Sequence, residues 1–295
     1  MSEENSSAVQ SFDGFIQVCS KKKNRRGQKN LQARSADFSS AYATRELSAD
    51  SGYVNIKPFL RRYAETECDL RLSTFFTDAT EKIFPFLEQA QIEAIVCLGL
   101  GRLSECAISR HQLAFIRCLQ EKINFKGEIQ FYDPIFNRDE VKILQDLEGI
   151  VLTENLEGKY LADRKTLFYL PHCPKQISNN LLWKNWQLDL LSNIILISNS
   201  FESILTNSPR RFLDANAKFI LEIAKYCVEI RFPVNYKYTD IFNDISLHCF
   251  DIAALKGVHS DFWKSVEPHY NVDTLELITR EIQQNLKVTN DDIHS

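Results

Sequence analysis

The stretch IVCLGLGRLSECAISRHQLAFIRCLQ, from Ile95 to Gln120, decides the fold of this chain. It opens with four apolar residues rich in β-formers, and Gly99 and Gly101 follow at once. Apolar residues then recur at helical spacing through positions 108–119. A strand, a glycine turn and a helix in this order predict the start of a βαβ unit in a parallel sheet.

The glycine turn leaves two interpretations open. In the first, the helix points its free N–H groups at a ligand above the sheet, and the glycines let that ligand come close. In the second, Gly99 and Gly101 only permit a tight turn from strand to helix. The dinucleotide fingerprint needs a third glycine further on, where this chain has Ser104 and Glu105, so the motif alone does not decide.

The composition excludes several classes of protein. With 295 residues, 44% of them hydrophobic, the chain is long enough for one large α/β domain or two small ones. A net charge of -4 argues against nucleic acid as a partner. The polar start MSEENSSAVQ is not a signal peptide. No apolar run approaches the roughly 18 residues of a membrane span, so we expect no membrane partner.

The cysteines point to a reducing compartment. All eight stand singly and none forms a Cys-x-x-Cys pair, which argues against a zinc site or a disulfide framework. We therefore predict no metal site and a protein of the cytoplasm or the nucleus. Cys97, Cys118 and Cys227 stand among apolar residues, and we expect them to be small core residues.

The first part of the chain differs from the rest. Residues 1–50 are rich in Ser, Asn and charge, which predicts a flexible basic tail before an α/β domain over residues 51–290. The run KKKNRRGQK, Lys21 to Lys29, is either a nuclear localisation signal or patch for an acidic partner, or a solvated tail.

Alternating helical and apolar stretches predict the architecture. Two amphipathic helices over 56–63 and 72–87 come first, with Pro85 kinking or ending the second. We expect further strands at 128–132, 150–153, 166–170 and 193–197, and helices at 139–147 and 180–191, the latter with Trp183 and Trp186 on one face. This pattern predicts a doubly wound, mainly parallel, Rossmann-like sheet with flanking helices.

The last third of the chain gives weaker patterns. We expect a helix over 210–226, strands over 228–234 and 245–250, and a terminal helix over 273–287. His248 lies inside the apolar run ISLHCF, which favours a structural histidine.

Polar residues gather where the predicted strands end, which is where ligands bind in open parallel sheets. We therefore predict that one rim of the domain holds a small ligand with an anionic part, through Gly99, Gly101, Asp133, His172, Cys173 and Asn199. The alternative is that these groups satisfy one another and the loop backbone.

Two of these positions admit a specific role. Asp133 stands where nucleotide-binding folds place a ribose-binding acid, although it is equally suited to a turn before Pro134. His172 and Cys173 lie between two prolines and form a poor catalytic pair, because adjacent residues of an extended segment point opposite ways. Cys173 before a proline also raises a thiolate ligand to haem iron as an alternative. No hydrolase, P-loop, metalloprotease or kinase signature is present.

Several motifs together resemble a known family. The runs LGLGRLSECAISRHQLAF, FYDPIF, LFYLPHCPKQISNNLLWKNW, IILISNSF and FNDISLHCF stand in the order of the Sensitivity to Red Light Reduced family of plants, fungi and animals. The resemblance covers about residues 92–250, and the basic segment near Lys21 is similar to the family's N-terminal region. The chain departs from the pattern at Cys249, where the family often has an aromatic residue.

The resemblance implies a regulatory role. Plant members are linked to light input and the circadian clock, animal members to haem biosynthesis and clock-gene expression, and fungal members to microtubule stability. No catalytic residue set comes with the family. We expect a regulator with protein partners in the cytoplasm and nucleus, without established catalytic activity and with its cofactor unknown. The alternative is a nucleotide-cofactor-binding enzyme, such as an S-adenosylmethionine-dependent methyltransferase.

Overall fold

The computed structural model describes residues 56–284 of the chain. The predicted basic tail, with the run Lys21 to Lys29, lies outside the described residues and stays a prediction, as does the boundary of the domain.

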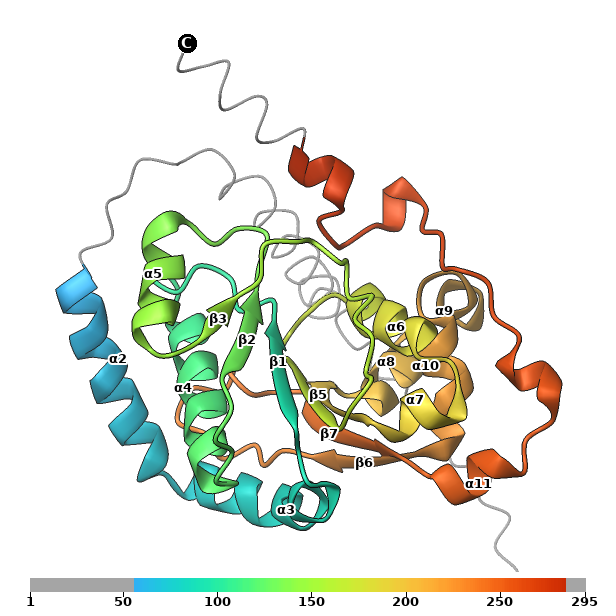
Figure 1. Cartoon of the computed structure of the whole chain (residues 1–295), viewed down its shortest axis with the longest axis horizontal. Coiled ribbons are helices and arrows are strands. Elements are labelled where there is room, and N and C mark those ends of the chain that lie inside the picture. The colour runs from blue at the N-terminus through green and yellow to red at the C-terminus, as the bar shows by residue number, and fades with distance from the viewer. Residues whose placement is uncertain (1–55, 285–295) are drawn as a thin grey trace, which may run out of the picture. The chain divides into compact units, whose positions relative to one another are not determined.

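The described residues form a mainly parallel sheet of seven strands with helices on both faces, which confirms the predicted fold class (Figure 1). The strand order is β3-β2-β1-β4-β5-β7-β6. Only β7 is reversed, because it pairs antiparallel with both β5 and β6. The strands are β1 Ala94–Leu98, β2 Ile129–Tyr132, β3 Ile150–Val151, β4 Thr166–Leu170, β5 Ile194–Asn199, β6 Cys227–Arg231 and β7 Ile245–Phe250.

The central strands are apolar throughout because both faces of the sheet are covered. Every residue of β1 and β4 is buried. Successive side chains alternate between two hydrophobic cores: Ile95 and Cys97 belong to one, whereas Val96 and Leu98 belong to the other. The apolar runs at 94–98 and 166–170 are therefore buried strands, whereas Ile150 of the edge strand β3 is exposed.

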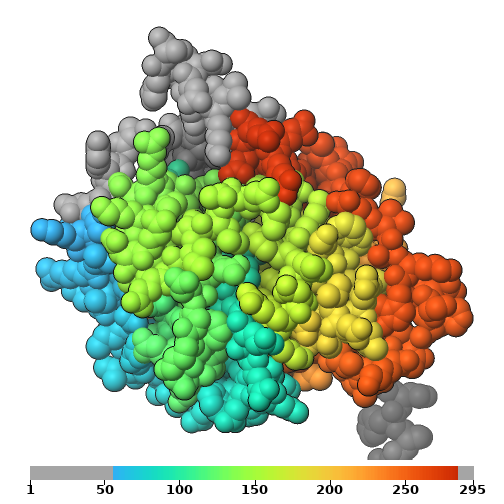
Figure 2. Space-filling view, viewed as in Figure 1, coloured from blue at the N-terminus to red at the C-terminus, as the bar shows by residue number. Residues whose placement is uncertain are grey.

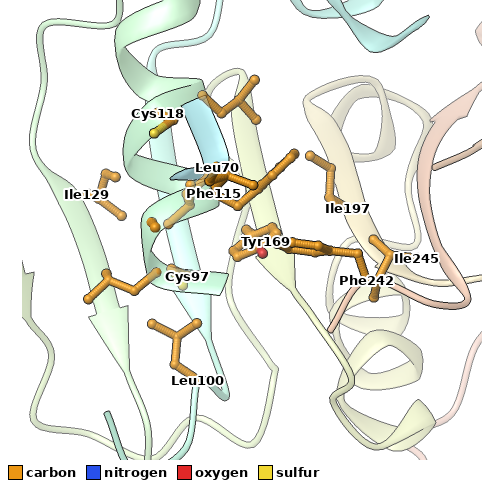
Figure 3. Close-up of a cluster of buried hydrophobic side chains, with 14 of the residues drawn as sticks. Leu70, Cys97, Leu100, Phe115, Cys118, Ile129, Tyr169, Ile197, Phe242 and Ile245 are labelled. Carbon is orange, nitrogen blue, oxygen red and sulfur yellow. The ribbon is translucent and has the colours of Figure 1, made fainter. Parts of the chain in front are cut away.

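The first core lies under the helices α2 (Ile56–Arg71), α3 (Thr74–Ala90), α4 (Ala107–Lys122) and α5 (Arg138–Asp146). Phe115 of α4 stacks on Tyr169 of β4, with ring centroids 5.9 Å apart (Figure 3). Pro85 lies inside α3 and does not end it, since Ile83 and Leu87 on either side are held in the core.

The second core lies under α6 (Lys175–Lys184), α7 (Leu188–Ser192), α8 (Phe201–Asn207), α9 (Arg210–Asn216), α10 (Lys218–Ile223) and α11 (Ile252–Lys256). The predicted helix over 180–191 was wrong in its bounds, because the chain leaves the helix between α6 and α7. Trp186 lies in that break, buried against Phe219 and Phe262, so it does not share a helix face with Trp183.

Several other predicted bounds also change. The helix over 210–226 is broken between α9 and α10, and β3 keeps only two of its four predicted residues. Residues 275–279 are not helical: only the short 3₁₀ turn Val272–Thr274 precedes them, and helix resumes at position 280. Cys97 and Cys118 are core residues as expected, but Cys227 is only half-buried because β6 is an edge strand.

Candidate functional site

The turn after β1 depends on both of its glycines. Gly99 and Gly101 have φ angles of 70° and 74°, which residues with a side chain rarely adopt. A Cβ atom on Gly99 would lie 2.3 Å from the Sγ atom of Cys173, which follows β4. The glycines therefore allow a tight turn and the close approach of a neighbouring loop of the same chain.

Asp133 holds this turn from the end of β2. Its Oδ2 atom accepts a hydrogen bond from the backbone N–H of Gly101 at 2.7 Å, and its Oδ1 atom accepts one from Ile135 at 3.0 Å. Burial raises the pKa of the Asp133 carboxyl to about 6, although the two backbone N–H groups oppose that rise. The carboxylate thus satisfies loop backbone, and each oxygen retains a second lone pair that a ligand hydroxyl could reach.

A second acid, Glu140, which was not among the predicted site residues, anchors the same turn. Its fully buried carboxylate accepts hydrogen bonds from the backbone N–H of Ser104 at 3.1 Å and from its hydroxyl at 3.0 Å. Arg102 lies 3.8 Å from the other oxygen. Asn137 and Glu140 form a capping box at the start of α5, and that Asn-x-x-Glu spacing was the signal available in the sequence.

In the loop after β4, the side chains of His172 and Cys173 lie in different surroundings. His172 is exposed, with its Nε2 atom 3.0 Å from the carbonyl oxygen of Asn243, and Cys173 is buried. The two side chains have different partners, and the backbone is not extended as the sequence argument assumed, because His172 has a φ of 55°. They do not form a catalytic pair.

The Cys173 thiol is engaged inside the protein. Its Sγ atom donates to the carbonyl oxygen of Leu98 at 3.3 Å. Burial, and to a lesser extent the charge of Asp133, raises the pKa of this thiol. A buried, protonated thiol of this kind does not favour the haem-thiolate alternative.

Asn199 closes the row of candidates. It is the last residue of β5 and does not lie in the turn that follows. Its Nδ2 atom donates to the carbonyl oxygen of Cys173 at 3.0 Å. Its Oδ1 atom is buried and has no hydrogen-bond partner among the described residues. Such an acceptor calls for a donor, because buried polar groups are nearly always hydrogen-bonded.

The contacts connect five candidates across the carboxyl ends of β2, β1, β4 and β5. Asp133 binds Gly101, Gly99 lies against Cys173, and Cys173 accepts from Asn199. The connection from β1 leads to β2 on one side, and β4 lies on the other, so the strand order switches there. His172 lies next to this row but turns towards Asn243.

A C-terminal strap, which we define as residues 264–284, lies in orange and red against the yellow and green segments (Figure 2). Gln283 accepts a hydrogen bond from the hydroxyl of Tyr132 at 3.1 Å, and its amide donates to the carbonyl oxygen of Pro134 at 3.4 Å. Further along, Asn155 donates to the carbonyl oxygen of Ile278 at 2.8 Å. The strap therefore passes close to Asp133, which no local pattern in the sequence indicates.

The described residues contain neither a metal-binding cluster nor a membrane helix. Within 56–284, no group of three or more His, Cys, Asp or Glu side chains could hold a metal ion. Within the same part of the chain, no helix has both the length and the apolar character to cross a bilayer.

The sequence of this chain is similar to a known family and to two animal proteins. Residues 73–249 match the SRR1 domain. The SRR1-like protein of Drosophila melanogaster is 36% identical over 229 residues, covering 77% of this chain and 80% of that protein. The SRR1-like protein of Mus musculus is 36% identical over 199 residues, which is 56% of this chain and 80% of that protein.

Two more distant matches are also found. The Arabidopsis thaliana protein SENSITIVITY TO RED LIGHT REDUCED 1 is 33% identical over 109 residues, covering 37% of this chain and 40% of that protein. Among solved structures, the crystal structure of SAH-bound Podospora anserina methyltransferase PaMTH1 covers 74% of this chain and 95% of that chain, with 14% identity and a TM-score of 0.36. A TM-score this low supports no argument about the fold. The fold class therefore rests on the strand order of this chain alone.

Proposed function

The chain belongs to the SRR1 domain family, and we propose that it is a regulatory protein that acts in the input to the circadian clock and in the control of haem biosynthesis. Family membership supports the pathway, and the site supports the regulatory character. The reactive groups of the carboxyl edge hold the protein together: Asp133 binds two backbone N–H groups, and the thiol of Cys173 donates to Leu98.

The same edge supports binding of a small polar ligand with an anionic part. The buried Oδ1 atom of Asn199 lacks a donor among the described residues, which is the observation that carries this proposal. Asp133 retains acceptor capacity further along the same edge, at the end of β2, and the exposed His172 supplies a polar side chain at the rim. Ligand binding there would change the loops after β1 and β4 together, since Gly99 and Cys173 are in contact.

The proposal includes the place of action and the partners. We place the protein in the cytoplasm and, through the run Lys21 to Lys29, in the nucleus. Its partners are proteins, and the net charge of -4 disfavours nucleic acid.

An S-adenosylmethionine-dependent methyltransferase, or another nucleotide-cofactor enzyme, is the second candidate. One specific observation favours it: a glycine turn after β1 is hydrogen-bonded to an acid at the end of β2, through Gly101 and Asp133. That is the position of a ribose-binding acid in folds of this kind. Fold alone supports many functions, so this candidate stands behind the regulatory one.

A thermal-shift screen separates the two candidates. The panel is S-adenosylmethionine, NAD, nucleotides and haem, measured on the full chain. A ligand present at 100 times its Kd adds about 2.7 kcal/mol to the free energy of unfolding. Asn199→Ala should weaken a ligand of the carboxyl edge, whereas Asn207→Ala, at an exposed residue of α8, should not. Silence across the panel contradicts the cofactor enzyme, and turnover of a methyl donor contradicts the purely regulatory role.

The pathway itself is tested in cells. Cells that lack their own SRR1-like protein should show altered clock-transcript rhythm and haem synthesis, and the intact chain should restore both. If the chain restores neither readout while it accumulates normally, the proposed pathway is wrong.

A further inference from the structure

A cleft opens between α2, the start of α4 and the segment 237–241, with a volume of about 710 Å³. None of the carboxyl-edge candidates lines it. The volume lies within the range of small-molecule sites in proteins, about 300–1,000 Å³. The cleft is therefore a separate place where a ligand could bind.

Three basic side chains of this cleft stand beside three carboxylates, which are Glu65, Asp69 and Asp240. Glu65 pairs with Arg61 outside the cleft and Asp69 with Lys237, so two arginines of the lining keep no ion pair within residues 56–284. Arg62 comes from α2 and Arg110 from α4, and neither forms an ion pair among the described residues. The third cation, Lys237, is already paired with Asp69 at 2.6 Å. The Nε atom of Arg110 is buried and has no hydrogen-bond partner in the described part of the chain.

The charge of Arg62 also acts on Arg110. The pKa of Arg110 is lowered, mainly by burial and to a lesser extent by the nearby guanidinium of Arg62. Like charges brought together in a partly buried cleft repel each other, and an anion between them would remove that repulsion.

The N-terminus of α4 faces the same space. Its first two residues, Ala107 and Ile108, line the cleft, and the preceding Cys106 provides no side-chain cap. The first-turn N–H groups of a 16-residue helix carry a partial positive charge and bind anions readily. The helix end and the two guanidinium groups thus favour the same kind of ligand.

One wall of the cleft is aromatic. Tyr238 is 51% exposed, and its ring meets the ring of His111 edge-on, with the centroids 5.2 Å apart. The wall continues with the aliphatic side chains of Ile108 and Ile241. Asp240 lies among the lining residues as an acceptor for hydroxyl groups. The Nζ atom of Lys237 lies over one face of the Tyr238 ring, 5.0 Å from its centroid, so a flat ring of a ligand would stack on the other face.

We propose that this cleft binds a phosphorylated small molecule with a planar ring, of the size of a nucleoside monophosphate. The phosphate lies between Arg62, Arg110 and the first turn of α4. The ring lies on Tyr238, and hydroxyl groups of the ligand donate to Asp240. Guanidinium groups suit phosphate because their planar N–H donors match its oxygens. This site goes beyond the proposed function and does not depend on it.

Calorimetric titration of the full chain with adenosine 5′-monophosphate tests the site. Arg62→Gln and Arg110→Gln should each weaken binding by about tenfold or more, because each removes charge-assisted hydrogen bonds. Lys57→Gln is the matched control, since Lys57 is an exposed cation on the same helix and does not line the cleft. Inorganic phosphate should compete with the nucleotide, and adenosine should bind more weakly than the monophosphate.

Three results would overturn the proposal. The first is no binding of adenosine 5′-monophosphate at millimolar concentration. The second is binding that both arginine variants leave unchanged. The third is binding that Asn199→Ala abolishes and Arg62→Gln does not, which would place the nucleotide at the carboxyl edge. Arg62 is exposed, so its variant remains informative if the Arg110 variant does not fold.

Discussion

Gly99→Ala should destabilise the protein through a single identified contact. Two effects add at this position: the φ of 70° is unfavourable for any residue with a side chain, and the new Cβ would lie 2.3 Å from the Sγ atom of Cys173. The left-handed backbone costs about 1–2 kcal/mol for alanine. Overpacking a closed core typically costs about 1–3 kcal/mol. We expect the free energy of unfolding to fall by about 2–5 kcal/mol.

A double-mutant cycle separates the two effects. Cys173→Ala removes the Sγ atom, and the Cβ of residue 173 then lies 3.8 Å from the new methyl group, an ordinary contact. In the Gly99→Ala background this second change should restore about 1–3 kcal/mol. In the wild-type background it should be destabilising, since it removes a buried side chain and its hydrogen bond to Leu98.

The assay is urea unfolding followed by tryptophan fluorescence, which the buried Trp186 makes sensitive to loss of the second core. Gly257→Ala is the matched control, because its φ is -88° and its nearest neighbour would lie 3.6 Å from the new Cβ. If the changes in the free energy of unfolding caused by Gly99→Ala and Cys173→Ala are additive within about 0.5 kcal/mol, the contact with Cys173 is not what excludes a side chain at position 99. That result would refute the reasoning.

Three further predictions concern Glu140, Asp133 and the C-terminal strap. Glu140→Gln should lower the free energy of unfolding by about 3 kcal/mol, because the buried carboxylate that holds Ser104 is lost. The control Glu148→Gln, at an exposed residue, should leave the free energy of unfolding unchanged. Equal urea midpoints for the two variants would contradict this prediction. Burial raises the pKa of Asp133 from 3.8 to about 6, so protonation favours the folded state and its contribution to stability falls as pH rises through that window; Asp133→Asn should flatten this part of the pH profile, and an unchanged slope counts against the assignment. Leu277→Ala removes a buried anchor of the C-terminal strap and should speed limited proteolysis within 264–284; an unchanged cleavage pattern would show that the residue does not hold the strap.

Local patterns identified most of the elements around the candidate site. β4 and β7 were predicted at their observed bounds, because a short apolar run closed by a turn residue is a signal contained in neighbouring residues. The bounds of helices were less predictable. Pro85 lies inside α3 although proline favours a helix end, since burial of Ile83 and Leu87 outweighs the local preference.

The strand order brought together candidate site residues that no sequence motif connects. The sequence indicated that polar residues follow each strand, and parallel strands bring such residues to one edge. It gave no means to predict that Asp133 would bind the backbone of Gly101, 32 positions away, since that pairing depends on β1 and β2 being neighbours. The ligand of this edge stays a prediction.

The sequence by itself determined the fold class, the two-faced burial of the strands and the glycine turn, because each depends on the spacing of residues close along the chain. Only the tertiary structure decided what those residues touch. Cys173 became a packing partner of Gly99, and Gln283 reached Tyr132 across 151 positions. The physical reason is that such contacts arise from the strand order and the path of long connections, which local periodicity does not encode.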